Sequence, residues 1–63
     1  MFSKNLKQIR IEKGISTSQI AEHLGITQTS YNKYENGLRE PNLSTFKMIC
    51  QFLNVSSDEL LDL

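Results

Sequence analysis

Apolar residues recur along this 63-residue chain every three or four positions, which is the spacing of one face of an α-helix. Short polar stretches separate these apolar stripes, and they contain glycine, asparagine, serine or threonine, the residues that commonly begin or end helices. No stretch alternates between apolar and polar residues as a half-buried strand does. The pattern predicts an all-α fold, with residues 1–63 forming a single domain.

Residues suited to cap helices divide this pattern into five expected helices. These cover about residues 3–13, 16–24, 27–36 and 42–54, followed by a short helix that opens at Ser56. Ser16 with Gln19, and Ser56 with Glu59, have the spacing of a capping box. The side chains expected to face the core are Phe2, Leu6, Ile9, Ile20, Ala21, Leu24, Tyr31, Tyr34, Leu43, Phe46, Ile49, Cys50 and Leu53.

The stretch TSQIAEHLGITQTSYNKYEN, residues 17–36, carries the most specific pattern. It contains the second and third expected helices, and Gly25 stands between them, where a positive φ lets the chain stop one helix and turn sharply. Ala21 is small enough for the third helix to cross closely over the second. This spacing predicts a helix-turn-helix, and the alternative is a plain pair of helices with no role in DNA binding.

The outward face of the third expected helix is polar. At ~100° per residue, the side chains that point away from its two tyrosines are Gln28, Thr29, Asn32 and Lys33. Glutamine and asparagine can pair with adenine, lysine can donate to guanine, and threonine offers a hydroxyl and a methyl group to thymine. We therefore expect these four residues to contact base edges in the major groove. The alternative is that they form the solvated face of any surface helix.

Phosphate contacts are expected around this helix, because helix N-termini and polar side chains near them suit phosphate oxygens. The candidates are Thr17, at the start of the second expected helix, and Asn36 and Arg39, beyond the end of the third. The alternative for each is a helix cap or a solvated loop residue.

The net charge of the chain is zero, whereas many DNA-binding domains are basic. The charge is unevenly distributed: residues 1–40 carry a net charge of +2 and residues 41–63 a net charge of −2. Because few cations are present to displace counterions from DNA, we expect one subunit to bind weakly and to need a second.

The sequence lacks the residues that several functional classes require. Cys50 is the only cysteine, which suits a small core residue in a reducing cytoplasm. No apolar run approaches the ~18 residues of a membrane span, and the N-terminus lacks a signal-peptide core. His23 is the only histidine, and the sequence has no evident nucleophile with a base and no metal-ligand cluster. We expect a cytoplasmic protein that is not an enzyme and has no cofactor, metal, small-molecule ligand or membrane partner.

The stretch from Ile15 to Leu61 resembles the Cro and phage-repressor type of helix-turn-helix, often called Xre-like. The residues that carry the resemblance are Ala21, Gly25, the YENG of residues 34–37, Pro41 and the NVSSDEL of residues 54–60. It implies a compact five-helix bundle of the lambda-repressor-like type. It also implies a homodimer that binds double-stranded operator DNA, usually to repress transcription. In that family the positions of Gln28, Thr29, Asn32 and Lys33 face bases, and those of Thr17, Asn36 and Arg39 lie near phosphates.

The resemblance also suggests an ion pair and two departures. Family members often pair an arginine of the first helix with a glutamate at the end of the third, and Arg10 and Glu35 match these positions; the alternative is two solvated charges. Thr17 stands where many relatives have glutamine. Tyr31 stands where they have an aliphatic residue, so it either packs between helices or turns its hydroxyl to solvent or a phosphate.

A two-fold dimer would place its third helices about 34 Å apart, in successive major grooves of a palindromic site. Leu60, Leu61 and Leu63 are candidates for the dimer contact, and the alternative places Leu60 and Leu61 in the core. A second function remains open, in which the same fold acts as a protein-interaction module such as an antitoxin or anti-repressor.

Overall fold

The structure, a computed structural model, describes residues 2–61 and contains five helices in that range. They are α1 (Phe2–Glu12), α2 (Thr17–Leu24), α3 (Gln28–Glu35), α4 (Leu43–Leu53) and α5 (Ser57–Leu61). The described residues contain no strand, and each helix lies within one or two residues of its expected position, so the predicted all-α fold is confirmed. None of these helices combines the length and the apolar content needed to cross a membrane.

The predicted caps set the helix starts. The Oγ of Ser16 accepts a hydrogen bond from the N–H of Gln19 at 3.0 Å, and the Oε1 of Gln19 accepts one from the N–H of Ser16 at 2.8 Å. Thr27 and Asn42 cap α3 and α4 with their side-chain oxygens, and Ser56 opens α5. Because these bonds satisfy backbone N–H groups that a helix leaves without partners, they fix where each helix begins.

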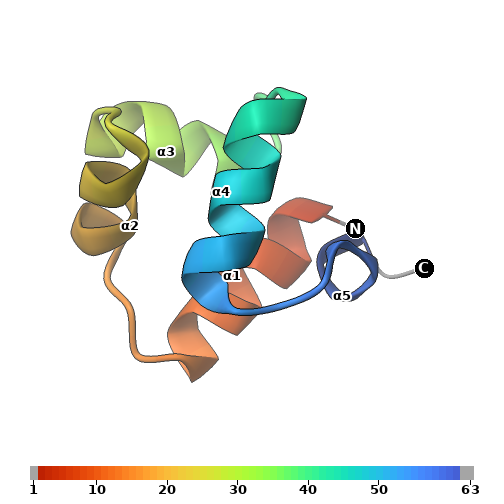
Figure 1. The fold of residues 1–63 in the computed structure, drawn as a ribbon. Helices are drawn as coiled ribbons and strands as arrows, with labels where there is room; N and C mark the ends of the chain where they lie inside the picture. The colour runs from red at the N-terminus through yellow and green to blue at the C-terminus, as the bar shows by residue number, and fades with distance from the viewer. Residues whose placement is uncertain (1, 62–63) are drawn as a thin grey trace.

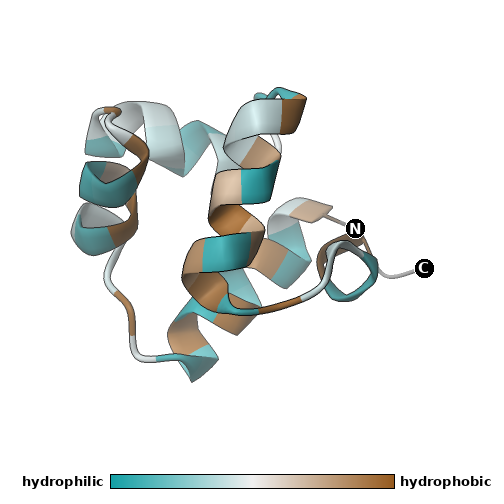
Figure 2. Ribbon diagram, viewed as in Figure 1, coloured by the Kyte–Doolittle hydropathy of each residue, from teal (hydrophilic) through white to brown (hydrophobic). Residues whose placement is uncertain are grey.

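The helices surround one core. Figure 1 shows α2 and α3 on one side of α4 and α5 on the other, with α1 crossing behind α4. In Figure 2 the outer side of α2 is hydrophilic, and its edge toward α4 is hydrophobic. The buried core consists of Leu6, Ile20, Ala21, Tyr31, Tyr34, Ile49, Leu53 and Leu60. Cys50 packs against this core, and burial raises the pKa of its thiol, so it remains a neutral, weakly polar side chain.

The leucines at the start of α4 and in α5 differ from one another in burial. Leu43 was expected in the core, and this is wrong, because its side chain is 68% exposed. It is the first residue of α4, so a correct helical spacing at the very end of a helix does not ensure burial. Leu60 is fully buried, as the core alternative predicts, whereas Leu61 is 42% exposed. Leu63 lies outside the described residues.

Candidate nucleic-acid interface

The turn between α2 and α3 is short and closed by backbone hydrogen bonds. Gly25 has a φ of +71°, and its N–H donates to the carbonyl of Glu22 at 3.1 Å, while the N–H of Ile26 donates to the carbonyl of Ala21 at 3.1 Å. No atom beyond Gly25 and its two chain neighbours lies within 4 Å of the position that a Cβ would occupy, so glycine is favoured here by its φ and not by lack of space. Ala21 is 2% exposed, and α3 packs against α2 beyond it.

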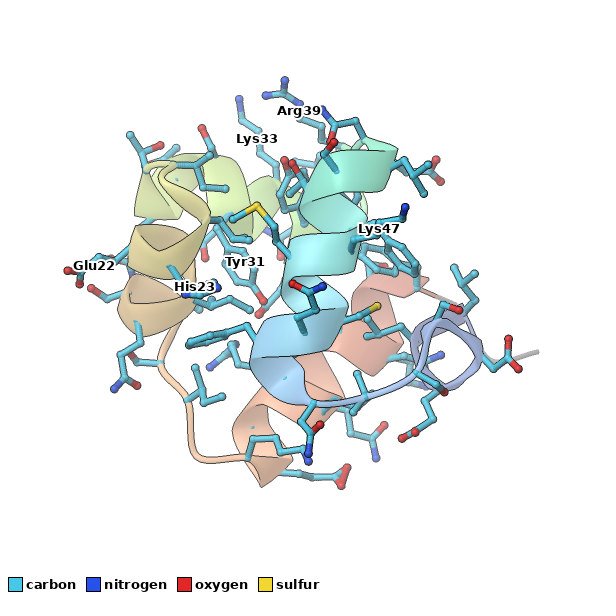
Figure 3. All side chains as sticks on the ribbon, viewed as in Figure 1. Glu22, His23, Tyr31, Lys33, Arg39 and Lys47 are labelled. Atoms are coloured by element: carbon cyan, nitrogen blue, oxygen red, sulfur yellow. The ribbon has the colours of Figure 1, made fainter. Side chains whose placement is uncertain are left out.

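Helix α3 has one aromatic face and one polar face. Tyr31 is fully buried and Tyr34 is 7% exposed, with their rings edge to face at a centroid distance of 6.1 Å. Figure 3 shows Tyr31 inside the bundle, between α2 and α4. On the opposite face, the side chains of Gln28, Thr29 and Lys33 are exposed and that of Asn32 is half-buried. The tyrosines thus hold α3 against the core and leave Gln28, Thr29 and Lys33 outside, whereas Asn32, also predicted on this face, is only partly exposed.

Arg10 and Glu35 join the end of α1 to the end of α3. The Nε of Arg10 lies 2.5 Å from the Oε2 of Glu35, and its Nη2 lies 3.2 Å from the Oε1. The Nη1 donates to the carbonyl of Ile15 at 2.8 Å, which ties the loop before α2 to the same guanidinium. The two charged side chains are only 12% and 6% exposed, so this is a buried, bidentate pair. The hydrogen bond with Glu35 raises the pKa of Arg10, which stays charged.

The Tyr31 hydroxyl is buried beside this ion pair. Among the described residues it has no hydrogen-bond partner of good geometry. Burial, followed by the neighbouring Glu35 carboxylate, raises the pKa of Tyr31 well above its ordinary value, so the hydroxyl is neutral. Of the options left open by the sequence, the ring therefore takes the one between helices, and its hydroxyl reaches neither solvent nor the outer surface.

A hydrogen bond that the sequence analysis did not anticipate joins the first turns of α2 and α3. The Nε2 of Gln28 donates to the Oγ1 of Thr17 at 2.6 Å. The two residues are eleven positions apart, and only the geometry of the turn brings them together, so no local pattern could have revealed the contact. The bond holds the Gln28 amide by one N–H, which leaves its other N–H and its Oε1 able to meet a ligand.

Two cations lie at one edge of the molecule, next to α3. Lys33 and Arg39 are exposed, and Figure 3 shows both side chains pointing away from the bundle at the same edge. The carbonyl of Lys33 accepts hydrogen bonds from the N–H groups of Leu38 and Arg39, at 2.9 and 3.3 Å, which fixes the loop after α3. Asn36 forms the C-cap through its backbone N–H, which donates to the carbonyl of Asn32, and its side chain is exposed.

Two short helices joined by a glycine turn, with the second held by aromatic residues and polar on its outer face, define a helix-turn-helix domain of the DNA-binding class. The chain belongs to the helix-turn-helix family, whose sequence profile matches residues 6–60.

Curated proteins with similar sequences agree with this family assignment. Over 61 residues the chain is 46% identical to the SPbeta prophage-derived uncharacterized HTH-type transcriptional regulator YonR of Bacillus subtilis, covering 97% of this chain and 56% of that protein. It is 30% identical to the cryptic phage CTXphi transcriptional repressor RstR of Vibrio cholerae, covering 97% of this chain and 55% of that protein. The chain therefore spans about half the length of these curated relatives.

A solved structure agrees with the fold. The crystal structure of the B. subtilis master regulator for biofilm formation, SinR, in complex with DNA superposes with a TM-score of 0.86 at 33% identity. The match covers 98% of this chain and all of that one. The resemblance to the Cro and phage-repressor type and the lambda-repressor-like five-helix fold are thereby confirmed. The family and these relatives are DNA-binding transcriptional regulators and not enzymes.

Proposed function

We propose that residues 1–63 form one DNA-binding domain that recognises a specific double-stranded sequence and regulates transcription in the cytoplasm. The observation that carries this proposal is the outward side of α3, where Gln28, Thr29 and Lys33 are exposed on a helix anchored by buried tyrosines. In this proposal two copies bind a palindromic operator and repress transcription by occupying a promoter.

Each of the four α3 residues predicted to contact base edges has a role in this proposal. Gln28, oriented by Thr17, offers one N–H and its Oε1 to the N7 and N6 atoms of an adenine. Asn32, one turn further along, offers the same groups to a neighbouring base pair. Thr29 contacts a thymine methyl group, and Lys33 donates to a guanine.

Phosphate contacts complete the interface. Arg39 and the side chain of Asn36 flank the end of α3, and the hydroxyl of Thr17 can donate its proton to a phosphate oxygen while it accepts the bond from Gln28. Because so few cations are involved, one domain binds weakly, and two domains spaced by about 34 Å reach useful affinity together.

The salt dependence of binding tests DNA binding against the rival function. Because Lys33 and Arg39 of both subunits bring about four cations close to the duplex, the affinity for duplex DNA should fall by about 100-fold between 50 and 200 mM salt. Fluorescence anisotropy with a labelled duplex measures this fall, and Arg39→Ala should reduce the logarithmic slope by about 1 for each subunit. An apolar protein interface changes little with salt. Absence of duplex binding at low salt would favour a protein-interaction module.

Substitution of Thr17 by valine keeps the shape of the side chain and removes the hydroxyl that accepts the Gln28 hydrogen bond. We expect preference at the base pair read by Gln28 to relax by about fivefold, since a lost hydrogen bond of this kind contributes about 1 kcal/mol. Competition between operators that differ at this base pair measures the preference, and Thr17→Ser should retain it. A uniform loss of affinity for all sequences would instead assign Thr17 to phosphate contact alone.

A further inference from the structure

The amide of Gln28 has a restricted set of groups left for a ligand. A glutamine side chain carries two N–H groups that donate and one carbonyl oxygen that accepts. The Nε2 of Gln28 donates one of its N–H groups to the Oγ1 of Thr17 at 2.6 Å. Because the side chain of Gln28 is exposed, its second N–H and its Oε1 are free to meet a ligand together.

These two groups fit the major-groove edge of adenine and not that of guanine. Adenine presents the acceptor N7 beside the N–H donor of N6, so one N–H and one oxygen match it. Guanine presents two acceptors, N7 and O6, and therefore needs two donors. Since Thr17 already takes one N–H of Gln28, the Oε1 would face the O6 of a guanine and repel it. The contact with Thr17 thus restricts Gln28 to adenine.

Both residues of this contact are held in place by their helices. Thr17 is the first residue of α2, which begins at the reciprocal hydrogen bonds between Ser16 and Gln19. Gln28 is the first residue of α3, which begins at the side-chain cap of Thr27. Because capped first turns of packed helices do not shift freely, Gln28 can leave its base only by breaking the hydrogen bond with Thr17.

We propose that Gln28, held by Thr17, makes the domain distinguish unmodified adenine from N6-methyladenine at one base pair in each half of its DNA site. The proposal rests on the function proposed above and adds a regulating signal to it. The signal is a methyl group that a DNA adenine methyltransferase has placed on the site beforehand, and it releases the domain from the DNA.

The methyl group removes the donor that Gln28 needs. The N6 nitrogen of adenine has two hydrogens, of which one pairs with thymine and the other points into the major groove. N6-methyladenine has one hydrogen at this nitrogen, and base pairing uses it. The methyl carbon then lies in the major groove beside N7. The Oε1 of Gln28 therefore meets a methyl group in place of a donor and is left without a partner.

No rearrangement of the Gln28 side chain restores the contact. If the amide turns over, its Nε2 faces the methyl carbon and its Oε1 lies against N7, which is also an acceptor. A different rotamer avoids the methyl group but loses the hydrogen bond with Thr17. Because each arrangement loses at least one hydrogen bond, we expect one methyl group to weaken binding by about tenfold.

The test uses an operator selected from a random pool of duplexes, at the base pair whose preference depends on Gln28. The same duplex is prepared unmodified, with N6-methyladenine at that base pair in one half or in both, and with N6-methyladenine outside the palindrome. Fluorescence anisotropy at low salt measures each affinity. For the wild type we expect a loss of about tenfold with one methyl group and about 100-fold with two. The methyl group outside the palindrome should change the affinity by less than about twofold.

Two variants and a matched control assign the effect to this contact. Gln28→Ala should bind the methylated and unmodified operators within about twofold of each other, because it has no amide for the methyl group to block. Thr17→Val should reduce the loss caused by one methyl group from about tenfold to about twofold, because Gln28 can then turn aside. Gln8→Ala, at an exposed position on α1, should keep the full loss.

Equal binding of the methylated and unmodified operators by the wild type would overturn this inference. So would a G·C base pair at the position that depends on Gln28, or an undiminished loss in Gln28→Ala. These results leave DNA binding intact. Failure of the wild type to bind any duplex of the pool would instead overturn the proposed function, and the inference with it.

Discussion

Replacing Arg10 by alanine is expected to destabilise the domain by about 3 kcal/mol or more, because it leaves Glu35 as an unpaired buried charge. The Glu35 carboxylate is 6% exposed and receives two hydrogen bonds from the guanidinium. Alanine also removes the donor to the Ile15 carbonyl, which links α1 to the loop before α2. A domain of this size has a total stability of roughly 3–9 kcal/mol, so much of the variant should be unfolded at room temperature or slightly above it.

Thermal melting followed by circular dichroism measures this loss. A change of about 3 kcal/mol corresponds to a fall in Tm of more than about 12 °C for a domain of this length. Arg39→Ala is the matched control, since Arg39 is exposed and its loss should change stability by less than about 0.5 kcal/mol.

A double variant separates the loss of the ion pair from the cost of leaving one buried charge unpaired. Arg10→Met combined with Glu35→Leu removes both charges and fills their space with apolar groups, so it should be more stable than either single substitution. A melt of Arg10→Ala that matches the wild type would mean that the pair does not hold α3 in place.

Local sequence patterns predicted the helices because the chemistry that sets them is local. Ser16, Thr27 and Asn42 each accept a hydrogen bond from a backbone N–H three residues later, a spacing visible in the sequence alone. The inward direction of Tyr31 and the outward direction of Gln28 likewise follow from the helical period once the helix is assigned.

Features that depend on contacts between elements could not be predicted in the same way. Leu43 has the spacing of a core residue, but its side chain, at the first position of α4, is 68% exposed, and spacing within one helix does not show how far the neighbouring helices reach. The hydrogen bond from Gln28 to Thr17 depends on the crossing of two helices. The contact between Arg10 and the carbonyl of Ile15 depends on the path of a loop.

In the candidate site, too, some features could be predicted from the sequence and others could not. The sequence predicted the residues of the α3 outer face, including Lys33, and the cation Arg39 beyond the helix, because helical periodicity and charge are visible in the chain. It did not reveal that Thr17 orients Gln28, and it assigned Thr17 only to phosphate. In the structure this hydroxyl accepts a hydrogen bond from Gln28, and it still has a proton to donate to a phosphate oxygen.

Loss of the Gln28 side chain should have the largest effect on DNA recognition. A bidentate contact between an amide and adenine contributes about 1–3 kcal/mol of discrimination, and a palindrome contains two such contacts. We therefore expect Gln28→Ala to weaken binding to the wild-type operator by about 100-fold or more. Stability should change little, because Gln28 is exposed and its side chain forms a single hydrogen bond within the described residues, to Thr17. Gln8→Ala makes the same chemical change at an exposed position on α1 and should leave binding unchanged.

Selection of bound duplexes from a random pool, carried out in parallel with the wild type, Gln28→Ala and Gln8→Ala, tests most directly whether α3 reads DNA. We expect the wild type and Gln8→Ala to enrich the same palindrome, and Gln28→Ala to lose its preference at one base pair in each half. Enrichment of no sequence by the wild type, or an identical palindrome from Gln28→Ala, would contradict recognition through this face of the helix.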